Sequence, residues 1–113
     1  MRTIKDELRG IPVLACRGAM TVGGGADELD EAFENALNPA ADGIVLDLTR
    51  LSYLDSAGIG AVVACSKKAA AAGVVMKIAL ARSGPVRRIF ELTQLERGFE
   101  IFDDADSAAA SFG

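Results

Sequence analysis

The chain has 113 residues, half of them hydrophobic, which fits one compact domain over residues 1–113 with a core of its own. The formal net charge is −4 and there is no basic run, which argues against direct binding of DNA or RNA. No apolar run approaches the ~18 residues of a membrane span. The charged N-terminus has no hydrophobic stretch of signal-peptide length. We therefore expect a cytoplasmic protein with no membrane insertion.

The sequence contains no histidine and only two cysteines, Cys16 and Cys65. This composition excludes a Ser-His-Asp triad and a Cys-His pair, and it argues against a closed tetrahedral zinc site within one chain. We expect no bound metal. Both cysteines lie in apolar stretches, so we expect two buried, reduced thiols.

The start of the chain predicts a β-hairpin followed by a loop. Residues 4–8 and 11–16 have strand character, and a turn at residues 9–10 joins them. Four glycines within residues 18–25 then indicate a loop, because glycine is unfavourable inside regular structure.

The middle of the chain alternates helix and strand. Apolar residues recur at helical spacing over residues 27–37. Residues 43–48 form a compact apolar run, typical of a strand covered on both faces. A connector over residues 49–54 leads to an alanine-rich helix over residues 57–72, which Gly73 ends.

The last part of the chain continues this alternation. Residues 74–80 predict a strand, residues 83–85 start a helix with a polar cap and an early proline, and residues 99–102 predict a short strand. Two aspartates at 103–104 cap a last helix. On these two helices we expect inward-facing side chains at Val86, Ile89, Phe90, Thr93, Ala105, Ala108, Ala109 and Phe112.

The resulting order, β-β-α-β-α-β-α-β-α, predicts an α/β domain. Strands that alternate with helices imply right-handed crossovers and parallel neighbours, whereas the initial hairpin is antiparallel. We therefore expect a mixed, mostly parallel sheet of about five strands, flanked by helices.

The turn Asp55-Ser56-Ala57-Gly58 is the segment where we expect function. Ser56 stands at or next to the N-cap of the following helix, where a serine commonly serves only as a cap, and Asp55 can assist. The helix start is unusually smooth, because residues 57, 58, 60 and 61 are all alanine or glycine. Each glycine costs an exposed helix about 1 kcal/mol relative to alanine. We therefore expect either another element or a partner to come close to the backbone there. The same helix is apolar nearly all the way round, which is typical of a docking surface.

A phosphate on Ser56 would carry a charge of about −1.5 to −2. The free N–H groups and the dipole of a helix N-terminus would tolerate this charge with little refolding. A bound partner with an apolar or acidic facing surface would not tolerate it. Such a site could switch binding while the fold stays unchanged.

Five segments also match a known family in their order along the chain: residues 43–48, 54–60, 72–73, 86–93 and 99–102. Together they resemble a STAS domain of the kind found in bacterial anti-sigma factor antagonists, and the likeness runs from residue 11 to residue 112. The Asp-Ser-x-Gly motif is fairly specific when it follows such a strand and opens such a helix. The resemblance implies a single STAS-like domain that is not an enzyme.

The resemblance further implies that Ser56 is phosphorylated by a partner that is both an anti-sigma factor and a serine kinase. The unphosphorylated form would bind that partner and free a sigma factor, and a phosphatase would restore the switch. The ATP belongs to the kinase, so we expect no cofactor and no catalytic residue in this chain. We expect a monomer or a weak dimer.

Thr21 is a departure from the family, because many antagonists carry an aspartate at this point. Its neighbours Met20 and Val22 could add apolar contact near Ser56. We expect the partner to contact the residues of this loop and of the helix start, namely Met20, Thr21, Val22, Asp55, Ser56, Ala57, Gly58, Ile59, Gly60 and Val63.

Two alternatives stay open. A constitutive STAS scaffold, or an accessory subunit of a stress-signalling complex or a lipid transporter, would use the same apolar helix face. An enzyme would use Ser56 with Asp47 or Asp55, and without histidine it would need a lysine as base. Lys67 and Lys68 lie ~16 Å along the helix at 1.5 Å per residue, which is too far for proton transfer.

Overall fold

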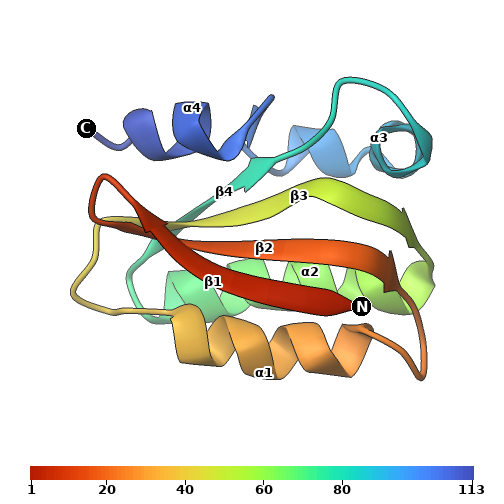
Figure 1. The fold of residues 1–113 in the computed structure, drawn as a ribbon, viewed down its shortest axis with the longest axis horizontal. Helices are drawn as coiled ribbons and strands as arrows, with labels where there is room; N and C mark the ends of the chain where they lie inside the picture. Colours follow the sequence, from red (N-terminus) through yellow and green to blue (C-terminus); the bar gives the residue numbers. More distant parts are fainter.

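The computed structural model describes residues 1–113 and shows one five-stranded sheet with helices on both faces (Figure 1). The strands lie in the order β1-β2-β3-β4-β5. The pair β1/β2 is antiparallel and the other neighbours are parallel. The predicted α/β class and the mixed, mostly parallel sheet are confirmed. None of the helices has the length and apolar character needed to cross a membrane.

The elements follow the predicted order, with one additional short 3₁₀ helix (η1). Their bounds are β1 Arg2–Leu8, β2 Ile11–Met20, α1 Ala26–Ala36, β3 Gly43–Leu54, α2 Ser56–Ala71, β4 Val75–Ala79, α3 Pro85–Leu92, η1 Leu95–Arg97, β5 Ile101–Phe102 and α4 Ala105–Ala110. The hairpin turns at Arg9 and Gly10, as predicted, and both residues have positive φ, as a type I′ turn requires.

The largest error of the sequence prediction concerns residues 49–54, which continue β3 instead of forming a connector. Two register shifts occur where β3 pairs with β2, and each places an extra residue in β3. As a result, Leu48, Leu51 and Leu54 are buried at every third position. The two-residue alternation that identifies a strand is therefore hidden.

Smaller differences occur at element ends. β2 runs to Met20, so the loop predicted over residues 18–25 begins only at residue 21. The predicted polar cap of α3 is absent, because Gly84 occupies the N-cap without a side-chain bond. Thr93 is exposed instead of inward-facing, since it lies just past α3 and its hydroxyl donates to the Ile89 carbonyl at 2.6 Å.

The core lies on both faces of the sheet. Figure 1 shows α1 and α2 on one side of the sheet and α4 on the other. The larger core includes Phe33 of α1, Val62 of α2 and Phe90 of α3. The smaller core contains Ala108 and Ala109 of α4, as predicted. Because α4 has only six residues, it covers only part of its sheet face.

Both cysteines are free thiols with no exposed surface in the larger core. Burial raises the pKa of Cys16 and of Cys65 to about 12. Because the thiolate is the reactive form, we expect neither thiol to react with a disulfide reagent in the folded protein at neutral pH. In urea both should react. Rapid labelling of either thiol without denaturant would contradict their burial.

Candidate functional site

The candidate site lies where the carboxyl ends of β2 and β3 meet. The two strands run parallel and end at the same edge of the sheet, near the start of α2 (Figure 1). The backbone N–H of Asp55 donates to the Met20 carbonyl at 3.2 Å. This bond holds the loop after β2 against the residues that open α2.

Asp55 is the N-cap of α2, and its carboxylate joins two segments of the chain. One oxygen accepts from the Gly58 N–H at 3.0 Å, which caps the helix. The other accepts from the Val22 N–H at 3.0 Å, which fixes the loop after β2. The bonds from the Val22 and Gly58 N–H groups hold the pKa of Asp55 below its ordinary value. The carboxylate is therefore charged at neutral pH.

Ser56 is the first residue of α2 and is exposed. The sequence left the cap open between Ser56 and Asp55, and the structure assigns it to Asp55. No hydrogen bond within the chain occupies the Ser56 hydroxyl, whereas that of Ser66, ten residues later in α2, donates to the Val63 carbonyl. The Ser56 side chain thus has no structural role in the cap.

Gly58 is where α2 comes closest to the end of β2. A Cβ at this position would lie 2.3 Å from the Met20 carbonyl oxygen and 2.8 Å from the Leu54 Cβ. The prediction that something approaches the backbone of the helix start is confirmed here, and the approaching element is the chain itself. Gly60 differs, because a Cβ there would meet nothing within 4 Å.

Thr21 closes the glycine-rich loop. Its N–H donates to the Gly24 carbonyl at 2.8 Å, and its hydroxyl donates to the same oxygen at 3.1 Å. The loop ends at Gly25, where φ is +106° and a Cβ would lie 2.8 Å from the Ala19 carbonyl oxygen. The loop is therefore a closed turn packed on the end of β2, and Val22 at its tip is 77% exposed.

The predicted partner-binding residues divide by exposure. Met20 and Gly58 are buried, and Met20 belongs to the larger core. The Met20 side chain packs in the core, and Gly58 is where α2 comes close to the end of β2, so we leave both residues out of the contact surface. The others are exposed or partly exposed, and we call them the Ser56 surface: Thr21, Val22, Asp55, Ser56, Ala57, Ile59, Gly60 and Val63.

The sequence interpretation missed an acidic hollow beside this surface. Asp27 and Asp30 of α1 line a hollow of about 320 Å³ together with Ala57 and Ala61 of α2. The small alanines leave this space between the two helices. The helical spacing of the two aspartates places them on one side of α1, but only the packing of α1 beside α2 brings them close to Ala57 and Ala61.

Two of the groups considered for serine catalysis, Asp47 and Lys68, are engaged with other groups. The Asp47 carboxylate accepts from the Thr49 N–H at 3.0 Å and from its hydroxyl at 2.7 Å. Lys68 pairs with Asp30 and Glu34 of α1. No cluster of three or more metal-ligating side chains is present. The arrangement around Ser56 suits recognition of its hydroxyl by another protein.

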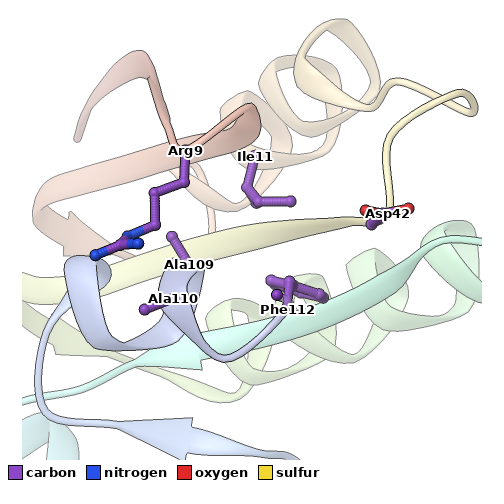
Figure 2. Close-up of a pocket in the computed structure, with 7 residues that line it drawn as sticks. Arg9, Ile11, Asp42, Ala109, Ala110 and Phe112 are labelled. Atoms are coloured by element: carbon purple, nitrogen blue, oxygen red, sulfur yellow. The ribbon is translucent and has the colours of Figure 1, made fainter.

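Another hollow lies at the far end of the sheet. Figure 2 shows it beside α4, lined by Arg9 and Ile11 of the hairpin, Asp42, and Ala109 and Phe112 near the C-terminus. Its volume of about 170 Å³ is below the ~300 Å³ at which small-molecule sites begin. It contains none of the predicted site residues.

The STAS domain family matches residues 3–108, nearly the whole chain, and the chain belongs to this family. It is 27% identical over 113 residues to BtrV of Bordetella bronchiseptica, a candidate anti-sigma factor antagonist, and the alignment covers 99% of this chain and 95% of BtrV.

Two solved structures share the fold over nearly their full length. An anti-sigma factor antagonist from Mycobacterium paratuberculosis has a TM-score of 0.83 at 20% identity, covering 98% of this chain and 92% of that one. The phosphorylated form of SpoIIAA, a cell fate determinant of Bacillus, has a TM-score of 0.65 at 18% identity, covering 97% and 99%.

The assignment of the cap to Asp55 predicts different thermal stabilities for variants of Asp55 and Ser56. We expect Asp55→Ala to lower the thermal midpoint by about 4–8 °C, because it removes the cap of α2 and the bond to Val22. Ser56→Ala should change the midpoint by less than about 2 °C, since the hydroxyl makes no bond. Thermal denaturation followed by circular dichroism measures both. Equal losses from the two variants would contradict the assignment.

The stabilisation that the Asp55 cap contributes depends on pH, and its direction follows from the pKa of Asp55. Because the pKa of Asp55 is lowered in the fold, its stabilisation is present at neutral pH and is lost as the pH falls through that lowered value. The stability difference between wild type and Asp55→Ala should therefore shrink in acid.

Proposed function

We propose that the protein is an anti-sigma factor antagonist that is switched at Ser56. The unphosphorylated form binds an anti-sigma factor that is also a serine kinase, and a sigma factor is released. Phosphorylation of Ser56 ends this binding. The observation that carries the proposal is the exposed, unbonded Ser56 hydroxyl at the first position of α2. Membership of the STAS family and the likeness to BtrV support it.

Charge explains how the switch acts without refolding. A phosphate adds about −1.5 to −2 at Ser56, and the N-terminal end of α2 tolerates it. The new charge stands next to the Asp55 carboxylate, and Asp27 lines the hollow beside the neighbouring Ala57. Any partner seated on the Ser56 surface then meets a concentrated negative charge that it must desolvate. Loss of binding follows while the fold remains.

We also propose where the protein acts, which enzymes change the state of Ser56, and how many copies of the chain work together. The protein acts in the cytoplasm, and a phosphatase removes the phosphate from Ser56. The kinase partner brings the ATP, so the chain itself needs no cofactor and performs no catalysis. It works as a monomer or a weak dimer.

Phosphosite mapping tests the proposal. The protein is incubated with its cognate kinase and ATP, and the site is mapped by mass spectrometry. We expect one phosphate, on Ser56, and none in Ser56→Ala. Ser66→Ala is the matched control on the same helix, and it should be phosphorylated like wild type. Phosphate on another residue with Ser56 unmodified would overturn the proposal.

A further inference from the structure

Three arginines form one row across β1, β2 and β3. Arg2 is the register partner of Arg17, and Arg17 is the register partner of Arg50. Register partners on neighbouring strands point to the same face of a sheet. Because neighbouring strands lie about 4.8 Å apart, the row spans about 10 Å.

None of the three arginines of this row forms an ion pair within the chain. The four ion pairs of the structure are made by Lys68, Lys77 and Arg82. Like charges that face each other across strands destabilise a sheet. In a chain with a net charge of −4, three adjacent arginines without ion pairs leave their guanidinium groups open to an anion from outside the chain.

The two carboxylates beside the row are engaged with other groups. Asp47 accepts from the N–H and the hydroxyl of Thr49 at 3.0 and 2.7 Å. Asp6 accepts from the Glu7 N–H at 2.7 Å. Neither lies within ion-pair distance of an arginine.

A hollow adjoins the row on the sheet face that α4 leaves partly open. Its volume is about 350 Å³, within the range of small-molecule sites. Arg17 and Arg50 line it together with the carboxylates named above. The remaining wall is apolar and comes from β1, β2 and the start of α4: Ile4, Leu8, Val13, Ala15 and Ala105.

The hollow is separate from the Ser56 surface. Val13, on its floor, belongs to the smaller core with α4, whereas α2 packs on the larger core. Figure 1 shows α2 and α4 on opposite sides of the sheet. A ligand in the hollow would therefore leave the Ser56 surface uncovered.

We propose that this hollow binds a phosphoanion with a short apolar body. The phosphate lies between Arg17 and Arg50, whose planar guanidinium groups match its oxygens two at a time. Arg2 adds positive charge at the edge, which favours a doubly charged phosphate over a single carboxylate. The apolar body lies over Ile4 and Ala15, the next register pair on the same face of the sheet after Arg2 and Arg17. The phosphate belongs either to a soluble metabolite or to a lipid head group.

Isothermal titration of the full chain with hexyl phosphate at low salt tests the site. We expect saturable binding with one site per chain, weaker binding of inorganic phosphate, and none of hexanol. Arg17→Gln and Arg50→Gln should each lower the affinity for hexyl phosphate at least tenfold. Arg88→Gln is the matched control, because Arg88 is an exposed cation of α3 outside any ion pair, and it should bind like wild type.

A stability readout shows whether the variants fold. Since the row is repulsive, Arg17→Gln and Arg50→Gln should keep or raise the thermal midpoint without ligand, and they should lose the rise that hexyl phosphate gives wild type. Binding to vesicles of phosphatidylcholine with and without phosphatidic acid shows whether the phosphate belongs to a lipid head group or to a soluble metabolite. Binding to phosphatidic acid that Arg17→Gln removes indicates a lipid head group, and binding of the soluble probe alone indicates a metabolite.

Three results would overturn the proposal. The first is no saturable binding of any phosphate probe. The second is unchanged affinity in both arginine variants. The third is concentration-dependent self-association that both variants abolish, which would assign the row to a contact between two copies of the chain.

Discussion

Gly58→Val is expected to lower the free energy of unfolding by about 3 kcal/mol, because overpacking of a close contact is costly. The added Cβ would stand 2.3 Å from the Met20 carbonyl oxygen and 2.8 Å from the Leu54 Cβ. One of these atoms belongs to the backbone of β2 and the other is held in β3, so neither can rotate away. Urea denaturation at neutral pH measures the loss.

Gly60→Ala is the matched control on the same helix. A Cβ at this exposed position meets nothing within 4 Å. Alanine should therefore stabilise α2 by about 1 kcal/mol through its higher helix propensity. If Gly58→Val were as stable as wild type, the close approach of α2 to β2 would be refuted, and with it the fixed placement of the Ser56 surface.

Ser56→Glu is expected to weaken binding to the anti-sigma kinase about 100-fold. A fixed charge without a partner in a desolvated contact costs about 3 kcal/mol, and each 1.4 kcal/mol is a factor of ten in affinity. The fold should be unaffected, since Ser56 is exposed at the first turn of α2, where a carboxylate is favourable. Surface plasmon resonance with the immobilised kinase measures the change.

Ser107→Glu controls for added charge. Ser107 is exposed in the first turn of α4, on the other side of the sheet from α2 (Figure 1). The substitution adds the same charge in a similar helical position, and it should leave the affinity for the kinase unchanged. Equal weakening by both variants would point to net charge as the cause and would contradict a contact centred on Ser56.

The order of elements could be predicted from the sequence because local patterns carry it. The turn at Arg9 and Gly10, the helical spacing of α1 and the apolar run that starts β3 each depend on neighbouring residues only. The end of β3 could not be predicted, since its two bulges exist only in the pairing with β2. The helix start was expected at Ala57 and lies one residue earlier, at Ser56, because Asp55 and not Ser56 is the N-cap.

Part of the geometry of the candidate site could be predicted from the sequence. Asp55 and Ser56 open α2 as expected, and the structure brings Val22 to the start of α2 through Asp55. Asp55 and Ser56 are both good capping residues, so the sequence alone left the cap open. The row of Arg2, Arg17 and Arg50 was not predicted at all, because residues this far apart become neighbours only through strand register.

The affinity of the cognate anti-sigma kinase for the two states of Ser56 tests the central claim most directly. Calorimetric titration of the kinase with unphosphorylated chain, and with chain phosphorylated only on Ser56, gives both values under one set of conditions. We predict tight binding of the unphosphorylated chain and binding on the order of 100-fold weaker for the phosphorylated one. Equal affinity of the two states would contradict the switch and would favour a constitutive scaffold or accessory subunit.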